Sequence, residues 1–216
     1  IVVVLWGILA SFEHSVDRWL HSILPFDYTV QLQDLTMGAY GTGTFPESAI
    51  GKIRKDPRVS EAYGVRARLI PFRDETVMLV AFETGKFRRL QEERKLGGDP
   101  GLDRWLKEGV SRGDVAVSIN FANLHGVRPG DSIPLSTPEG ELPFRISDTL
   151  IDFSWPRGVV AIDLEMYRRI WKDRTLTYID VAAAKGVDRE ALRTDLGTIF
   201  ENRFDVFVYD TAEIRS

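Results

Sequence analysis

The spacing of hydrophobic and polar positions first predicts a helix at the N-terminus. The run IVVVLWGILASF carries no charge before Glu13. Beyond that run, apolar residues recur at helical spacing, opposite a polar side that includes Glu13, and Pro25 ends the pattern. We therefore predict one long helix over residues 1–24. The apolar face of its second half comprises Phe12, Val16, Trp19, Leu20, Ile23 and Leu24.

This N-terminal run favours a membrane origin. Twelve apolar residues are too few to cross a bilayer, which takes about 20, and no basic region precedes them as in a signal peptide. We interpret residues 1–25 as the end of a transmembrane helix followed by an amphipathic stalk. The alternative is a buried core helix that continues into an amphipathic one. At the other end, Asp210 or Thr211 with Glu213 resembles a helix start, so residues 211–216 are expected to begin a return helix.

Alternating apolar and polar residues after the stalk predict strands on both sides of a short helix. The segment 28–33 alternates as a strand does. Thr44 and Glu47 have the spacing of a capping box, and Ala49, Ile50 and Ile53 would form the apolar face of the helix that follows. Strands are expected over 59–69 and 75–82.

A second strand–helix–strand pattern lies near the C-terminus. It consists of a strand over 176–183, a helix capped by Asp188, and a closing strand over 204–208. Together, residues 26–101 and 173–210 are expected to form one split βαβ, ferredoxin-like sheet.

The residues between these two parts predict an inserted unit. Segment 102–172 contains short strands punctuated by Pro and Gly. It also contains a short helix from Ser118 to Gly126 and a helix over 164–171. We expect a small β-rich subdomain of the open-barrel or sandwich kind. The predicted fold class is therefore α+β, with a stalk helix stub, a split βαβ sheet and an insertion.

Composition and charge exclude several classes of function. The chain is 44% hydrophobic and 28% charged, as in a globular protein. A net charge of −4 provides no field that would attract nucleic acid, so no nucleic-acid partner is expected. The absence of cysteine excludes disulfides, thiol catalysis and cysteine-based zinc sites. It leaves the cellular compartment open.

The motifs do not form a catalytic or metal site. Ser111 lies in a G-x-S-x-G match, but a helix-like segment precedes it and a strand follows, the reverse of a nucleophile elbow. His14 and His21 are too far apart along the stalk to share a metal, and His125 suits a helix C-terminus. We predict a non-enzyme with no catalytic, metal or cofactor residue.

The remaining charged residues suggest structural roles. Asp148, Asp152, Asp163 and Asp180 are each interpreted as a cap or a turn residue. The basic residues of segment 88–95 alternate with acidic ones, which is typical of a solvated helix face.

Trp155 is the one candidate contact for a partner. It lies in the turn FSWPR, where a large aromatic side chain has difficulty reaching a core. Packing inside the inserted subdomain is the alternative.

Four segments resemble the extracytoplasmic domain of MacB/FtsX-type ABC transporter permeases. They are FEHSVDRWLHSILPFDYTVQ, VSINFANLHGVRPGDSIPL, DFSWPRGVVAIDLEMYRRIWKD and LTYIDVAAAKGVDREALRTDL. By this resemblance the split βαβ part corresponds to the Porter subdomain of the family, and the insertion corresponds to its Sabre subdomain.

The resemblance implies a membrane permease whose domain faces the periplasm or the cell exterior. ATP would be used by a separate nucleotide-binding domain or cytoplasmic subunit, so no cofactor is expected in this domain. The permease would be dimeric, and a periplasmic protein or lipoprotein cargo would be its further partner. Coupling would run from ATP hydrolysis through the stalk to export, lipoprotein release or partner activation. The alternative hypotheses are a ligand-sensing domain of a membrane receptor and a membrane-anchored hydrolase that uses Ser111.

Overall fold

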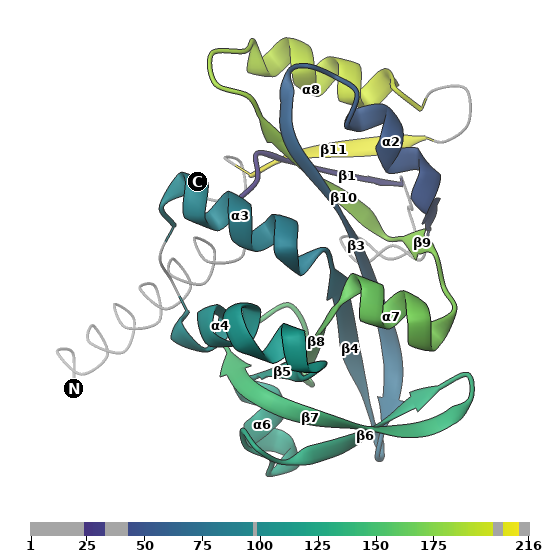
Figure 1. The fold of residues 1–216 in the computed structure, drawn as a ribbon. Coiled ribbons are helices and arrows are strands. Elements are labelled where there is room, and N and C mark those ends of the chain that lie inside the picture. The colour runs from purple at the N-terminus through teal and green to yellow at the C-terminus, as the bar shows by residue number, and fades with distance from the viewer. Residues whose placement is uncertain (1–23, 33–42, 97–98, 201–204, 212–216) are drawn as a thin grey trace, which may run out of the picture.

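A computed structural model describes residues 24–32, 43–96, 99–200 and 205–211. Its centre is a nine-stranded mixed sheet with the order β11–β1–β10–β3–β4–β8–β5–β7–β6, and helices pack on both faces (Figure 1). The large mixed sheet with helices confirms the α+β class. The predicted helix over residues 1–24 lies outside the described residues except for Leu24, which is not helical, and so do the other five residues of the stalk face.

One half of the sheet is entirely antiparallel. It is formed by β1 (Tyr28–Leu32), β11 (Val206–Asp210), β10 (Tyr178–Ala183) and the long strand β3 (Val59–Phe72). β1 lies between β11 and β10, and β10 lies between β1 and β3. The strand that brings the chain into the domain is therefore an inner strand, with the last strand on one side of it.

The other half of the sheet contains parallel pairs. Its strands are β4 (Glu75–Phe82), β8 (Val159–Asp163), β5 (Val115–Ser118), β7 (Gly140–Leu150) and β6 (Ser132–Thr137). β4 pairs with β8, and β5 with β7, in parallel. The described strands of segment 102–172 thus continue the same sheet, and the expectation of a separate barrel or sandwich is wrong.

Helices cover both faces of the sheet. One face carries α2 (Ile50–Ile53), α6 (Ile119–His125), α7 (Leu164–Trp171) and α8 (Arg189–Thr198), whose apolar residues join one core cluster with Tyr28, Val30 and Leu79. The opposite face carries α3 (Thr84–Arg94) and α4 (Pro100–Arg104), which form a second cluster with Phe26, Tyr63 and Trp105. A π-helical turn (Trp105–Gly109) and α5 (Val110–Arg112) continue α4.

The predicted caps at Ser118 and Asp188 are confirmed, and the one at Thr44 is wrong. The Ser118 hydroxyl accepts from the Phe121 amide at the start of α6, and Gly126 ends that helix with φ +64°. Asp188 caps α8 through the Ala191 amide. Thr44 caps nothing, because Phe45–Pro46 forms a short strand, β2, that pairs with β9 (Thr175–Leu176). A 3₁₀ helix (Glu47–Ala49) then leads into α2 without a side-chain cap.

Two predicted strands differ in extent. The strand expected over 176–183 is divided into β9 and β10 at Thr177, whose hydroxyl accepts from the Ala67 amide. The Thr177 amide also donates to the Val65 carbonyl at 2.8 Å, so the chain remains bonded to β3 between β9 and β10. The strand expected over 59–69 runs on to Phe72, because Pro71 and Phe72 still pair with Thr76 and Glu75 of β4.

Candidate functional site

The incoming and outgoing ends of the described chain are bonded together at one place on the sheet. The Thr211 amide donates to the Asp27 carbonyl at 2.9 Å. The Thr211 hydroxyl shares its proton between the carbonyls of Phe26, at 2.9 Å, and Asp27, at 2.8 Å. Thr211 is only 3% exposed. We call this region, formed by residues 24–28 and 209–211, the junction.

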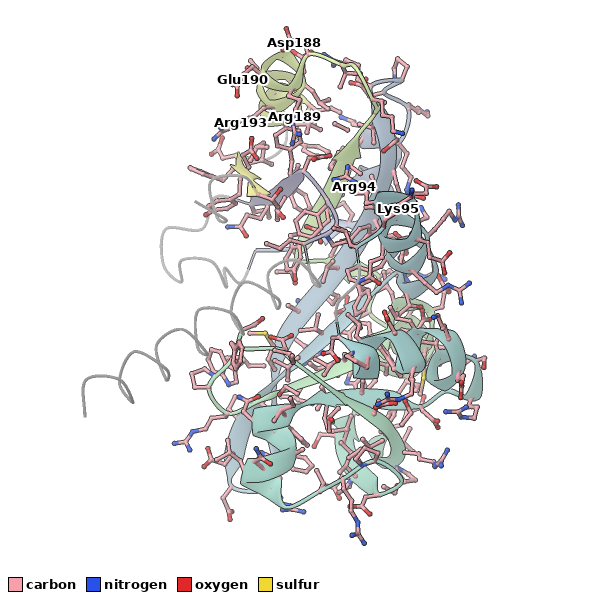
Figure 2. The ribbon with its side chains drawn as sticks, turned by 90° about the vertical axis from the view of Figure 1, so that its left-hand side faces the viewer. Arg94, Lys95, Asp188, Arg189, Glu190 and Arg193 are labelled. Carbon is pink, nitrogen blue, oxygen red and sulfur yellow. The ribbon has the colours of Figure 1, made fainter. Side chains whose placement is uncertain are left out.

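The Asp27 carboxylate draws three further elements to the junction. Arg94, from the last turn of α3, donates to both of its oxygens, at 3.1 and 2.5 Å. Arg189, the first residue of α8, donates to Oδ1 at 2.8 Å, and the Ala183 amide at the end of β10 donates to Oδ2 at 2.8 Å. Figure 2 labels both arginines, and a cation at the end of α3 also suits the helix dipole.

The pKa of the Asp27 carboxyl reports how strongly these groups hold it. Burial alone would raise this pKa. The hydrogen bonds from Arg94 and Ala183 and the charges of Arg94 and Arg189 outweigh burial, so the pKa lies below its ordinary value. The carboxylate is therefore ionised at neutral pH, and two guanidinium groups compensate its charge.

The two arginine-bearing helices are attached to the sheet by further bonds. The Tyr28 hydroxyl donates to the Arg189 carbonyl at 2.9 Å, and the Arg189 guanidinium lies 5.7 Å from the Tyr28 ring centre. At the start of α3, the Glu83 carboxylate accepts from the Gly64 amide at 2.8 Å and from Arg54 at 2.5 Å. A displacement of the incoming segment would therefore act on α3, α8 and β3 together.

A series of ring contacts leads from the junction into the second core cluster. Phe26 meets Tyr63 edge to face with 6.0 Å between ring centres, and Tyr63 meets Phe87 at 5.9 Å. Phe82 then contacts Phe87 at 5.1 Å and Trp105 at 5.7 Å. Because the series passes through β3, α3 and β4 to the helical segment after α4, it connects the junction with the other half of the sheet.

The structure places two of the site residues expected from the sequence. Leu24 is half-buried and packs against the cluster of Phe26 and Tyr63. Trp155 is also half-buried; its indole nitrogen donates to the Thr76 carbonyl of β4 at 2.9 Å, and Asn120 of α6 donates to its carbonyl. These bonds hold the turn around Trp155 to β4 and α6. Phe12, Val16, Trp19, Leu20 and Ile23 lie outside the described residues.

Other candidate residues have structural contacts. The Ser111 hydroxyl donates to the Glu108 carbonyl within the helical turn. His125, the last residue of α6, packs between the rings of Phe72 and Phe121. Asp163 caps α7, and Asp152 accepts from Ser154 in a turn, as expected.

The cap-or-turn interpretation is wrong for two carboxylates. Asp148 lies within β7 and is paired with Arg104 of α4. Asp180 lies in the middle of β10 and accepts from the Thr29 hydroxyl of β1 at 2.7 Å. Both side chains meet partners that are remote in sequence, and local spacing cannot reveal such contacts.

Two shallow surface grooves stand out, one of about 340 Å³ between α8 and β11 and one of about 530 Å³ beside α2. Across the described ranges, no three acidic or histidine side chains gather in a way that could hold a metal ion. Within the same ranges, no helix combines the length and the apolar character needed to cross a bilayer.

Asp27, Arg94 and Arg189 were missed at the level of sequence. Arg94 was assigned to a solvated face, but it is bonded to a carboxylate that is 7% exposed. One signal was available: Asp27 is the single charged residue in the otherwise apolar and β-forming stretch ILPFDYTV. A lone carboxylate in such a stretch is more often paired than solvated.

Comparison with known proteins shows a similarity to one curated sequence. No protein-family model matches the chain. A Mycobacterium tuberculosis protein described as an uncharacterized ABC transporter permease protein is 25% identical over 209 residues. The match covers 96% of this chain and 24% of that relative, so the chain spans about a quarter of the relative's length.

Solved structures share the fold. The periplasmic region of MacB from Actinobacillus actinomycetemcomitans matches with a TM-score of 0.58 and 10% identity, over 91% of this chain and 94% of that one. The extracellular domain of the noncanonic ABC-type transporter YknZ from Gram-positive bacteria matches with a TM-score of 0.54 and 11% identity, over 86% and 99% of the two chains.

These findings confirm the resemblance noted in the sequence. The chain has the fold of the extracytoplasmic domains of MacB and YknZ, and its sequence is similar to part of an ABC transporter permease. The role of the whole permease is therefore a matter for proposal.

Proposed function

We propose that this domain transmits the motion of a permease helix, driven by cytoplasmic ATP hydrolysis, to a protein or cargo outside the membrane. The single observation that carries this proposal is the junction. The chain enters and leaves the sheet at one place, and Asp27 connects that place to α3, α8 and β10. Such an attachment would let two neighbouring membrane helices move the domain as one piece.

The proposal assigns roles to parts of the larger protein. A separate ATP-binding subunit or domain would supply the energy, the permease would work as a dimer in the cytoplasmic membrane, and the domain would face outward. The function of the domain would be mechanical, in export, lipoprotein release or partner activation, and would involve no catalysis of its own. Trp155 remains our candidate contact for an outside partner.

We also propose that the domain consists of two subdomains, as expected from the sequence. In support, the strand order β11–β1–β10–β3 with α2 and α8 is that of a split βαβ unit. Residues 26–101 and 173–210 would be the Porter-like part, and residues 102–172 the Sabre-like insertion. β4 pairs with both β3 and β8, and it would therefore link the two subdomains.

The experiment uses the full-length permease that contains this chain, assembled with its ATP-binding partner in lipid nanodiscs. A dye at Glu139, in the exposed turn between β6 and β7, would report energy transfer to a dye in the lipid. We expect ATP to change the transfer. Insertion of Gly-Gly after Val16, within the predicted stalk, should abolish that change while ATP turnover continues, because a flexible break transmits little force.

A control insertion of Gly-Gly after Glu139 should leave the ATP-dependent response in place. Persistence of the response after the stalk insertion would contradict the proposed path. A full-length sequence with a kinase-like region after the next span, together with a domain that does not move with ATP, would favour the receptor alternative.

A further inference from the structure

The buried carboxyl of Asp180 lies in the middle of the antiparallel half of the sheet. Strand register places it opposite Thr29 of β1 on one side and Tyr63 of β3 on the other. Asp180 is 3% exposed and Tyr63 is 1% exposed. One cross-strand row therefore holds a hydroxyl, a carboxyl and a phenol, on the face that α3 covers with Phe87.

Asp180 has neutral donors where Asp27 has cations. Its Oδ1 accepts from the Thr29 hydroxyl at 2.7 Å. In the part of the chain that the structure describes, no Lys, Arg or His nitrogen lies within ion-pair distance of it. Arg94, a cation close to this row, is hydrogen-bonded to both carboxylate oxygens of Asp27. The titratable group that acts on Asp180 directly is Tyr63, and Tyr63 is in turn influenced by Tyr178 and by Arg94.

The Tyr63 hydroxyl is left without a partner of normal geometry. It is fully buried and makes no hydrogen bond among the described residues, although it is close enough to Asp180 for each group to affect the other's pKa. An ionised carboxylate can only accept hydrogen bonds, whereas a protonated one also donates. A protonated Asp180 could therefore donate to the Tyr63 oxygen while it accepts from Thr29.

We propose that Asp180 is protonated in the folded domain at neutral pH, and that its ionisation in alkaline medium loosens the attachment of β1 at the junction. On ionisation the proton passes to bulk water and leaves a bare carboxylate between β1 and β3. Such a charge is stabilised by water entering the sheet, which requires the strands to separate. The protonation does not depend on the proposed function, whereas its effect on force transmission does.

Electrostatics agrees with this geometry. Burial raises the pKa of Asp180 to about 8, against the lowering effect of the Thr29 hydrogen bond and of the nearby Tyr63 hydroxyl. The ordinary value, 3.8, applies to the unfolded chain. Between these values the folded state holds a proton that the unfolded state has lost. Stability from this group is therefore complete below about pH 4 and is lost as the pH rises to about 8.

The test compares the 216-residue chain with its D180N variant in urea unfolding, followed by tryptophan fluorescence from pH 5 to pH 9. For one proton, the unfolding constant of the wild type should rise by about tenfold per pH unit relative to D180N, up to about pH 8. Other titrating groups, such as His125, are common to both proteins and cancel. A ratio that stays constant from pH 5 to pH 9 would overturn the proposal.

A second variant and two direct measurements keep the proposal testable if D180N does not fold. In Y63F the midpoint of the pH dependence should move to higher pH, because the Tyr63 hydroxyl can donate to the ionised carboxylate more strongly than it accepts from the protonated one. Infrared spectra in D₂O at pH 7 should show the carbonyl band of a protonated buried carboxyl, and its absence would overturn the protonation. Hydrogen exchange of segment 24–32, corrected for intrinsic rate, should accelerate above pH 8, and an unchanged rate would overturn the loosening.

Discussion

Asp27 and Asp180 lie on either side of the boundary between β1 and β10, and they differ in what faces them. Burial disfavours the charge on both. Asp27 meets two guanidinium groups and an amide, and its pKa is lowered, whereas Asp180 meets hydroxyl groups and its pKa is raised. Two acidic side chains of the same type thus carry opposite protonation at neutral pH. The partner contributed by distant parts of the chain decides the charge, and burial alone does not.

The largest expected effect on the free energy of unfolding comes from neutralising Asp27, the carboxylate with two arginine partners. D27N should lower the free energy of unfolding by about 3 kcal/mol, because two guanidinium groups lose the charge that compensates them. Urea unfolding at pH 7 measures it. D148N is a matched control: the Asp148 side chain is equally buried, but its partner Arg104 is 60% exposed, so screening should limit the loss to about 1 kcal/mol or less. Equal losses of unfolding free energy in D27N and D148N would show that the Asp27 ion pairs stabilise the fold no more than the Asp148 pair does.

A smaller effect should come from the bond that joins the two chain ends. T211V removes the hydroxyl shared by the carbonyls of Phe26 and Asp27 and should cost about 1–2 kcal/mol. The exposed Thr194, whose hydroxyl donates within α8, provides the control variant T194V, with a loss below about 0.5 kcal/mol. If T211V has no effect, the Thr211 hydroxyl does not stabilise the junction, which is then held by its backbone hydrogen bonds and the Asp27 ion pairs.

The smallest effect concerns acid. A lowered pKa means that Asp27 contributes stability above its ordinary value of 3.8, and that this stability is lost as the pH falls below it. From pH 4 to pH 3 the wild type should therefore lose more stability than D27N, by at most about 1 kcal/mol. Thermal unfolding at a series of pH values would show it. If the two proteins lost stability equally as the pH fell below 4, Asp27 would have its ordinary pKa in the folded state.

Local patterns predicted the helices and strands well, and for identifiable reasons. α6 begins at Ser118 and ends at Gly126, and α8 begins after Asp188, because capping depends on residues within one turn. β2 escaped prediction because its partner, β9, is remote in sequence. The same limit hid the continuous sheet: β4 and β8 pair in parallel across a long connection, and nothing in either segment specifies the other.

The junction was harder to predict than the fold. Asp27 is separated from Arg94 by 67 positions and from Arg189 by 162. Segment 88–95 has the charge pattern of a solvated helix face, and only the folded chain distinguishes the one arginine that turns inward. Asp180 looked like a turn residue because Asp favours turns, yet its position in β10 is set by pairing with β1 and β3.

The long strand β3 gives the sheet an offset with a mechanical consequence. β10 pairs with its first part, from Val59 to Val65, and β4 pairs with its second part, from Val65 to Phe72. The two halves overlap at a single residue, Val65, which faces both Tyr178 and Phe82. A sheet joined in this way resists stretching along β3 but yields more readily to torsion about it. The two halves of the sheet should therefore twist about β3 more easily than they separate along it.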